Sequence, residues 1–558
     1  MHLPLQAYQF IKYTTPSANL QIGAASESGA VVCFDFEDGQ VNPFDGNHDA
    51  TLKALAREQF AKLNKASAPI TGRIGVRVNP ISSEEFEKDL IVLEGRNLEA
   101  LFVPKISQRK ELDEISEKLK NSNIQIEKLI PIIESKIGLE NLETLLEGNS
   151  EISLIAFGHC DYNLDIGAFP FFHQDSWQYW KWMHVLTKTA TKYHVRVINS
   201  PYLCRNNDAH FEAMLGHLKD NENLFHGQVT LSAEQSRQCL RLNGASSVFK
   251  ELLKSTGLVA MGKAYALELV SEFERNNKTR GLSKSKDKFI SLQEYKASKN
   301  FIEDIRPVNE FCFVGGCFAV QHTIVFEDLF HQQLKRRIEG EKAIRLNINI
   351  IRYARLNTVL ERIETLLEKK GLNQLVFHIQ PEPYLRMVKA MYRYTNEKGK
   401  VKWSLNLAIL DKLNSETYDY LEMPGQRHIE IKTENSKLHQ FLISCNYLLG
   451  TLLGNERIAK RRYQMLCNDV INLCKGKNIS CLLLGPNRRS NTLLEPLFCK
   501  ALDEYISMRT DSETYVSGFI RDDEEKMNME NGIHVTQAYH DRIGERLYAK
   551  LRDMAPKN

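Results

Sequence analysis

The feature that most constrains this chain is an alternation of short apolar runs with amphipathic segments over roughly its first 235 residues. Each β-branched run is followed by a polar turn and a helix-like segment before the next run begins. Parallel strands are buried on both faces and therefore read as continuous apolar segments. Eight such runs in series predict an α/β fold with a closed (β/α)8 barrel rather than an open sheet. Strands are expected at Tyr8–Lys12, Val31–Phe36, Ile74–Val78, Leu101–Val103, Leu129–Ile133, Leu154–Phe157, Val195–Ile198 and Gln228–Leu231.

A second α/β pattern begins near Phe311 and runs to the end of the sequence. About five parallel strands with helices on both faces predict a separate three-layer, doubly wound domain. Its strands are expected at Glu310–Val314, Leu346–Ile350, Leu375–Ile379 and Ile479–Leu484, and Val535–Met554 is expected to form the last helix.

Between these two patterns the segment Glu272–Asn300 is polar and basic. A basic run can bind phosphate groups, but no aromatic residue is interleaved in 274–288 to stack on bases. We therefore interpret the segment as a solvated linker, which divides the chain into domains at 1–271 and 306–558 with a linker at 272–305.

Composition and charge indicate the class of protein. The 558 residues are 42% hydrophobic and 26% charged, which is typical of folded globular domains. The 73 basic and 70 acidic residues leave a net charge of +3. Because no large positive field results, nucleic acid is disfavoured as the main partner and small molecules are favoured.

The N-terminal residues lack a basic start followed by a long apolar run, so no secretory signal is expected. No apolar stretch is long enough to predict a membrane span. The eleven cysteines show no paired CxxC spacing, which favours reduced thiols over disulfides. These features predict a cytoplasmic protein.

Polar residues follow four of the expected barrel strands, at the end where such barrels carry their chemistry. They lie in Asp35-Phe36-Glu37-Asp38-Gly39, Arg77-Val78-Asn79-Pro80, Glu134-Ser135-Lys136 and Gly158-His159-Cys160-Asp161. Glu134 and Asp161 follow successive strands, so their carboxylates would repel each other unless a cation lay between them. Mg²⁺ binds one or two carboxylates together with waters and substrate oxygens. Arg77 would offer a planar fork to a carboxylate or carbonyl oxygen.

The alternative interpretation is that these side chains only cap helices or pair with Lys105 and Lys136. Taken one by one, each carboxylate fits that alternative better. The coincidence of all four motifs favours a site for an anionic oxo-substrate.

Six short motifs occur in order along this half of the chain: Phe34-Asp35-Phe36-Glu37-Asp38, Lys53-Ala54-Leu55-Ala56-Arg57, Val76-Arg77-Val78-Asn79-Pro80, Val103-Pro104-Lys105, Ile133-Glu134-Ser135-Lys136-Ile137-Gly138-Leu139 and Gly158-His159-Cys160-Asp161-Tyr162. In order and spacing they resemble the citrate lyase beta-subunit-like family of HpcH/HpaI aldolases, over about residues 8–235. The resemblance implies a TIM barrel, usually oligomeric, that makes or breaks a carbon–carbon bond in a hydroxy acid or its acyl thioester.

The resemblance also implies roles for individual residues. Glu134 and Asp161 would hold Mg²⁺, and Arg77 would be catalytic by orienting the substrate. Asp38, Glu37 and Asn79 would bind substrate with Arg77.

The sequence departs from the family pattern near the end of the barrel. Asn199 stands where an aspartate is common, and Gly227–Gln235, with Ser232, lacks the usual lysine, histidine and proline. Coenzyme A therefore stays a candidate partner rather than an expected one.

In the second half, the expected strand Glu310–Val314 runs into Gly315-Gly316-Cys317. Two glycines permit a tight strand-to-helix turn, and a thiol at a helix N-terminus has a lowered pKa. His534 precedes the last expected helix and could meet Cys317 at the carboxyl end of the sheet, as a base beside a nucleophile. A small buried cysteine is the alternative.

These residues resemble SGNH/GDSL hydrolases, in the branch whose first block reads Gly-Ser-Cys-Phe-Ala, over about residues 306–556. The resemblance implies a flavodoxin-like domain with Cys317 as nucleophile and His534 as base. Asn531 replaces the usual aspartate, and no Gly-x-Asn occurs around Gln380-Pro381-Glu382. His378 is better explained as a hydrogen-bonded core residue. The aromatic cluster from Phe169 to Trp182 is better explained by packing or an oligomer contact.

Two functions are consistent with the sequence. The first is a bifunctional enzyme, a Mg²⁺-dependent lyase or aldolase fused to an SGNH-like hydrolase or acyltransferase, with glycan modification as one setting. The second is a binding or assembly protein in which one or both domains have lost turnover. A homo-oligomer is expected in either case.

Overall fold

The computed structural model describes residues 5–44, 46–65, 73–149, 151–205, 207–241, 249–253, 263–276, 281–321, 324–342, 344–353, 356, 359–369, 372–395, 401–405, 437–490, 492–520 and 534–554. Among these residues the chain divides into two compact units, the first reaching Ile305 and the second beginning at Arg306.

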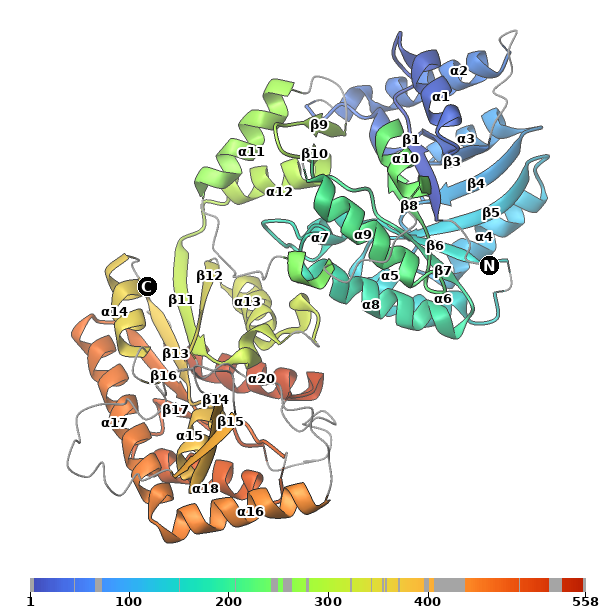
Figure 1. Ribbon diagram of the computed structural model, residues 1–558. Helices are drawn as coiled ribbons and strands as arrows, with labels where there is room; N and C mark the ends of the chain where they lie inside the picture. The colour runs from blue at the N-terminus through green and yellow to red at the C-terminus, as the bar shows by residue number, and fades with distance from the viewer. Residues whose placement is uncertain are drawn as a thin grey trace. The chain divides into compact units, whose positions relative to one another are not determined.

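The first unit is built on a closed barrel of eight parallel strands (Figure 1). The strands are β1 (Gln6–Phe10), β2 (Val31–Asp35), β3 (Ile74–Arg77), β4 (Asn97–Val103), β5 (Gln125–Ile133), β6 (Leu154–Phe157), β7 (Arg196–Asn199) and β8 (Phe225–Thr230). The barrel closes where β1 pairs with β8, with Gln6 opposite Gly227 and Tyr8 opposite Val229. The predicted barrel is confirmed, because each of the eight apolar runs forms a strand.

Helices connect successive strands and cover the outside of the barrel. They are α1 (Ala18–Glu27), α2 (Asp49–Lys65), α3 (Glu85–Leu93), α4 (Arg109–Lys120), α5 (Lys136–Glu140), α6 (Leu142–Leu146), α7 (His159–Asp165), α8 (Trp177–Lys192), α9 (Asp208–Asp220) and α10 (Ala233–Arg241). A cluster that includes Tyr8, Cys33, Phe102, Ile132 and Val229 fills the inside. With the inside filled, the carboxyl ends of the strands, here called the mouth, are left to carry a site.

The aromatic cluster after α7 belongs to the packing of this unit. Tyr179 and Trp182 on α8 are fully buried, and both rings contact Phe157 at the end of β6. Of the two expectations from sequence, packing is what the described contacts show.

The segment expected to be a linker is folded and belongs to the first unit. It contains α11 (Lys263–Asn276), β9 (Leu282–Lys284), β10 (Phe289–Ser291) and α12 (Leu292–Glu303). The interpretation as a solvated linker is wrong because its polar groups are paired internally. Glu294 is fully buried, and Lys288 Nζ donates to its Oε1 at 2.6 Å.

The second unit contains a parallel sheet of five strands. Its order is β12 (Arg345–Arg352), β11 (Val308–Gly315), β13 (Gln374–His378), β16 (Ser480–Leu484) and β17 (Tyr515–Val516). Four of these strands were expected, and the two-residue β17 was not. A separate antiparallel hairpin joins β14 (Met391–Thr395) and β15 (Val401–Leu405).

Helices cover both faces of this sheet. Successive side chains of β11 point to opposite faces, and those from Phe311 onward are buried on either face. Phe311 and Phe313 pack with α13 (Phe330–Glu341) and α20 (Gln537–Met554) on one face. Cys312 and Val314 pack on the opposite face. The helices there are α14 (Val359–Lys369), α15 (Pro381–Val388), α16 (Lys437–Leu452), α17 (Asn455–Gly476) and α18 (Glu495–Ser507). The second unit is therefore a three-layer α/β arrangement, as expected.

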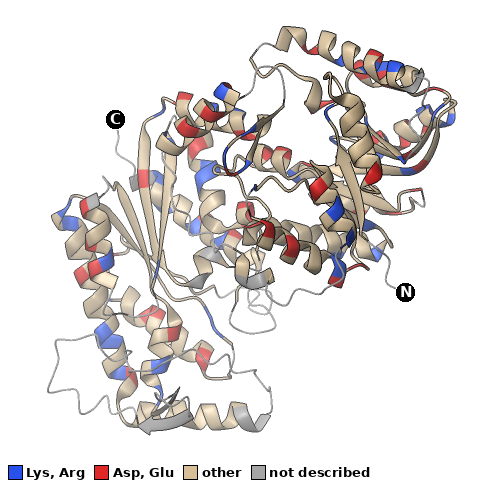
Figure 2. Ribbon diagram, turned by 45° about the horizontal axis from the view of Figure 1, so that its top comes forward, with Lys and Arg blue, Asp and Glu red and all other residues tan. Residues whose placement is uncertain are grey.

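Basic and acidic residues are mixed along the helices of both units (Figure 2). Within the part of the chain that the structure describes, no helix combines the length and the apolar character needed to cross a membrane.

Candidate active site

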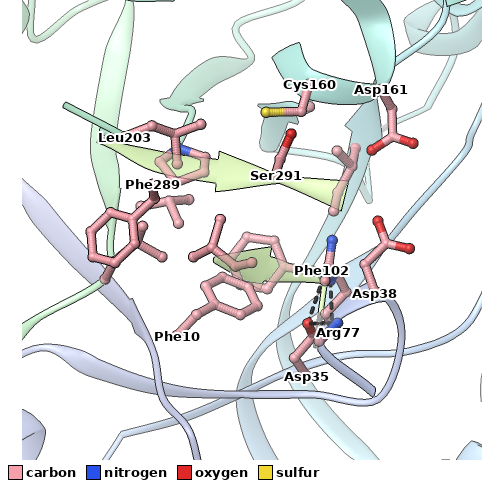
Figure 3. A pocket seen from close by; sticks show the side chains of 18 of the residues that line it. Phe10, Asp35, Asp38, Arg77, Phe102, Cys160, Asp161, Leu203, Phe289 and Ser291 are labelled. Carbon is pink, nitrogen blue, oxygen red and sulfur yellow. Dashed lines mark hydrogen bonds and ion pairs between the residues drawn. The ribbon is translucent and has the colours of Figure 1, made fainter. Parts of the chain in front are cut away.

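The mouth of the barrel holds a cavity of about 290 Å³. Strand ends and the loops after them supply one part of its lining, including Asp35, Asp38, Arg77, Glu134 and Asp161. The residues that follow the barrel, 281–293, supply another part and are here called the roof segment. Figure 3 shows this cavity with acidic side chains and Arg77 gathered on one side, and with Phe289 and Leu203 on the other.

Arg77, at the end of β3, is bound by its neighbour at the end of β2. Its Nε and Nη2 donate to the two carboxylate oxygens of Asp35 at 2.7 and 2.6 Å. Its Nη1 lies 3.0 Å from Oε2 of Glu37. The sequence predicts a guanidinium that is free to bind substrate, but Asp35 occupies one edge of it and Glu37 contacts Nη1.

Asp35 is itself held in place by the turn that follows β2. The backbone N–H groups of Glu37 and Gly39 donate to its carboxylate at 3.0 and 2.8 Å. Burial opposes ionisation, yet the charge and hydrogen bonds of Arg77 hold the pKa of Asp35 below its ordinary value. The ion pair therefore fixes Arg77 at the edge of the cavity.

Glu134 follows β5 and is buried beneath the cavity. Its Oε1 accepts the backbone N–H of Lys105 at 2.7 Å. Lys105 has a φ of 59°, a strained left-handed conformation for a residue other than glycine. A Cβ at Gly158 would lie 2.4 Å from Glu134 Oε2, so the glycine is what leaves room for this carboxylate.

Asp161, in the first turn of α7, and Asp38, after β2, lie near each other on the same side of the cavity (Figure 3). The Nε2 group of Gln293 donates to Asp38 Oδ2 at 2.7 Å and to Asp161 Oδ2 at 2.9 Å. Gln293 lies in α12, so the roof segment ties together two carboxylates of the barrel.

Several of these carboxyl groups resist ionisation. Burial and then repulsion from Asp161 raise the pKa of Glu134 well above its ordinary value. Burial and Asp38 raise the pKa of Asp161 to about 6 and that of Glu37 to about 7. The carboxylates in turn raise the pKa of Lys105, against the effect of burial. These shifts show a cluster in which negative charge exceeds its local compensation.

Two expected substrate-binding residues do not line the cavity. Asn79 is fully buried, donates to Asp89 Oδ2 at 2.8 Å and accepts from Lys53 Nζ at 2.6 Å. Glu37 is 3% exposed and lies beside Arg77 and Lys105. Both residues support the site from behind it.

The carboxylates of Glu134 and Asp161 fit a magnesium ion that keeps several coordination positions for water or substrate. Mg²⁺ takes few protein carboxylates and keeps several water or substrate oxygens, and a dication would relieve the repulsion that raises the pKa values of Glu134 and Asp161. Among the described residues, no group of three or more His, Cys, Asp or Glu side chains is placed to hold a metal ion. A magnesium ion at the mouth would therefore rest on two carboxylates, with water or substrate oxygens as its other ligands.

That the roof segment would line the cavity was not expected from the sequence. Phe289, Ser291 and Gln293 all line the cavity. The available signal was the alternation of apolar Leu282, Phe289 and Ile290 with polar residues inside a run that was interpreted as solvated.

The second unit holds a smaller cavity of about 40 Å³ at the carboxyl ends of β11 and β13. Gly316, His378, Gln380, Arg489 and His534 are among its lining residues. Cys317 opens the short helix after β11, but its side chain lies outside the described residues, as does Asn531. The structure thus brings His534 to the turn that carries Cys317.

His378 and His534 differ from what the sequence suggested. Both ring nitrogens of His378 are buried without a hydrogen-bond partner among the described residues, and burial lowers its pKa to about 3. It is a core histidine, as expected, but not a hydrogen-bonded one. Burial and the charge of Arg489 lower the pKa of His534.

An eight-stranded parallel barrel with an acidic mouth defines an α/β-barrel protein whose architecture places enzyme sites at that end. Residues 23–212 match the model of the HpcH/HpaI aldolase/citrate lyase family. This match extends over most of the barrel, and Arg77, Glu134 and Asp161 lie within it. It ends before the roof segment and the second unit.

Several solved structures are similar to this chain at low identity. RipC from Yersinia pestis is 17% identical, with 46% of this chain and 97% of that chain covered and a TM-score of 0.32. The citrate lyase beta subunit complexed with oxaloacetate and magnesium from M. tuberculosis is 15% identical, with 43% and 98% covered and a TM-score of 0.33. The Haloferax volcanii malate synthase pyruvate/acetyl-CoA ternary complex is 17% identical, with 53% and 89% covered and a TM-score of 0.40. No curated protein matches the chain.

Proposed function

We propose that the first unit is a Mg²⁺-dependent carbon–carbon lyase or aldolase that acts on a hydroxy acid or its acyl thioester. The observation that carries this proposal is the gathering of Asp38, Glu134 and Asp161 with Arg77 around one cavity. The family match over residues 23–212 supports the reaction class. The substrate and the direction of the reaction go beyond that match.

In this proposal Glu134 and Asp161 hold the metal, and the bound metal supplies a Lewis acid for an oxo or carboxylate oxygen. Cleavage of the carbon–carbon bond leaves an enolate, whose negative charge needs a positioned positive group in a water-poor cavity. Arg77 meets that need, because its salt bridge with Asp35 fixes the guanidinium at the cavity.

Like Asp35, which is engaged by Arg77, Asp38 lines the cavity without belonging to the proposed metal pair. Its Oδ2 accepts from Gln293, whose amide also holds Asp161. We assign it to contact with the substrate, in keeping with its place on the wall. Asn79 and Glu37 then act by supporting the neighbouring strand ends.

The experiment is turnover of purified full-length protein on a panel of hydroxy acids and their thioesters, with and without Mg²⁺. Metal-dependent cleavage is expected, and Glu134→Ala and Asp161→Ala should each abolish both turnover and calorimetric Mg²⁺ binding. Asp113→Ala, on the exposed side of α4, serves as a carboxylate control. If no Mg²⁺ binds and neither site variant changes anything, the barrel is a binding or assembly module.

For the second unit we propose an SGNH-like, flavodoxin-type domain that acts on an acyl or ester group. The observation in its favour is that Gly316, next to Cys317, and His534 line one cavity. Cys317 would be the nucleophile and His534 its base. A thiol-reactive or acyl-ester probe should label Cys317 faster than the other ten cysteines. Labelling at the rate of a buried cysteine such as Cys499 would contradict this assignment.

A further inference from the structure

We propose, on the basis of the lyase function above, that the substrate carries a compact apolar group. This group binds in an apolar subsite between the barrel and the roof segment. The subsite separates the reacting oxo acid at the carboxylates from an uncharged tail at the opposite wall.

The cavity is divided by chemistry into two sides. Figure 3 shows Asp38, Asp161, Asp35 and Arg77 on one side and Phe289 with Leu203 on the other. The ring of Phe10 lies between them, with its centroid 5.7 Å from the guanidinium carbon of Arg77. Apolar side chains from several strand ends and from the roof segment continue that wall, namely Phe102, Ile132, Val229, Leu231 and Leu282. A ligand that fills the cavity must therefore present an apolar surface opposite its acidic end.

The apolar wall is built from two parts of the chain that are firmly joined. The N–H of Phe289 donates to the carbonyl of Leu203 at 2.7 Å, and the N–H of Arg205 donates to the carbonyl of Asp287 at 2.7 Å. Arg205 also lies over the ring of Phe289, 5.8 Å from its centroid. These contacts hold the Phe289 ring in place, so the subsite is formed before the substrate binds.

The roof segment is also fixed at the acidic side. A Cβ at Gly281 would lie 2.2 Å from the carbonyl oxygen of Asp38, so the two backbones are in close contact. Gln293 adds hydrogen bonds to Asp38 and Asp161. Since both ends of the roof segment are anchored, Phe289 is a fixed wall of the cavity.

The size and polarity of the cavity limit the group that this side can accept. The whole cavity measures about 290 Å³, and the carboxylate side must also hold the oxo acid and a hydrated metal. A charged or strongly polar tail would lose its hydration against Leu203 and Phe289, whose side chains offer no hydrogen bond. Each buried methylene, in contrast, strengthens binding about fourfold. A short branched or cyclic hydrocarbon group fits both limits.

The test compares two acids that share the same oxo acid end. Calorimetry of the full chain with Mg²⁺ should show that 4-methyl-2-oxopentanoate binds at least about tenfold more tightly than pyruvate. Equal or tighter binding of pyruvate overturns the apolar subsite but leaves the lyase proposal standing. Failure of both acids to bind, with and without Mg²⁺, overturns the lyase proposal and this inference with it.

Variants of Phe289 test whether the preference for the branched acid arises at the apolar wall. Phe289→Ala should weaken binding of the branched acid about tenfold and change pyruvate binding less than about twofold. Phe289→Trp should exclude the branched acid by filling the subsite and spare pyruvate. Phe44→Leu is the control, because Phe44 packs on Phe273 and Tyr295 outside the cavity. Equal losses for both acids in the Phe289 variants would show a general disturbance and contradict the inference.

Discussion

The two cavities of this protein differ in size and in how far the charges that line them are balanced. The barrel cavity, at about 290 Å³, is lined by carboxylates whose pKa values are raised by burial and mutual repulsion. The cavity of the second unit, at about 40 Å³, is lined by two histidines with lowered pKa values and by Arg489.

This difference separates the two proposed activities. The barrel cavity is deficient in positive charge and large enough for a small substrate together with a cation. The smaller cavity is lined by Arg489, which is paired with Glu382 at 3.5 Å, and by two histidines with lowered pKa values. Its lining therefore shows no comparable excess of negative charge that a metal would relieve. The following variants are expected to change one cavity and leave the other unaltered.

The largest loss of activity is expected from a change at Gly158, whose missing side chain leaves space for the Glu134 carboxylate. In Gly158→Ala the new Cβ would collide with Glu134 Oε2 and displace that carboxylate. Displacement of a catalytic group by about an ångström costs on the order of 100-fold in rate, so metal-dependent turnover and Mg²⁺ affinity should both fall by about that factor. Steady-state kinetics and calorimetry measure them.

Gly23→Ala provides the control, since nothing lies within 4 Å of the position where its Cβ would be. Thermal melting of both variants checks that they are folded. Unchanged Mg²⁺ affinity in folded Gly158→Ala would remove Glu134 from the metal site.

A smaller loss is expected when the link between roof segment and barrel is cut. Gln293→Ala removes the amide that holds Asp38 and Asp161, and loss of such a supporting hydrogen bond costs about tenfold in metal affinity. Calorimetric titration with Mg²⁺ measures this loss. The matched control is Gln537→Ala in the second unit, whose Nε2 likewise donates to two oxygens, at Asp328 and Asp541. Similar Mg²⁺ affinities in both variants would show that Gln293 does not position the carboxylates.

The pH dependence of stability gives a third prediction. The folded state raises the pKa of Asp161 to about 6, above an unfolded value of about 3.9. The folded protein therefore binds the proton more tightly, and stability decreases as pH rises between these two values. Asp161→Asn should raise the melting temperature of metal-free protein by a few degrees at pH 8 and have little effect at pH 4.

Magnesium should reverse this loss. In the unaltered protein the stabilisation by Mg²⁺ should grow from pH 5 to pH 8, as Asp161 ionises, and it should vanish in Asp161→Asn. Melting curves at several pH values measure both effects. A stabilisation by Mg²⁺ that does not depend on pH would place the ion away from Asp161.

The smallest effect is expected in the second unit. Because burial and Arg489 lower the pKa of His534, its ring should stay a neutral base to a lower pH than an ordinary histidine does. His534→Gln should slow labelling of Cys317 severalfold, and Arg489→Ala should slow it at pH 6 but not at pH 8. Mass spectrometry of the labelled protein measures these rates. Rates that do not respond to either change would leave His534 without a role as base.

Most of the fold could be predicted because continuous apolar runs have one interpretation in a long α/β chain. The runs at Val31 and Leu154 begin strands at those residues. The two-residue β17 could not be found, because Tyr515 and Val516 are too short a run to show a period. The linker was misinterpreted because Lys288 and Glu294 cancel each other's charge inside the fold, and a linear sequence does not show that pairing.

The site was predictable at the level of residue types and less so at the level of contacts. Strand ends predicted that Glu134 and Asp161 face one mouth. The pairing of Arg77 with Asp35 depends on the register between β2 and β3, where the two residues are directly opposite. The fixation of Asp38 by Gln293 joins residues 255 positions apart, which no local pattern could indicate.

The position of the roof segment along the chain decides where this protein can be cut. A polypeptide that ended at residue 271 would keep all eight barrel strands but would lack Phe289 and Gln293. Its carboxylates would open to bulk water, and its apolar wall would become an exposed hydrophobic patch prone to aggregation. A fragment that extends to Ile305 retains α12 and lacks only the second unit. The chemistry of the barrel can therefore be measured on that fragment.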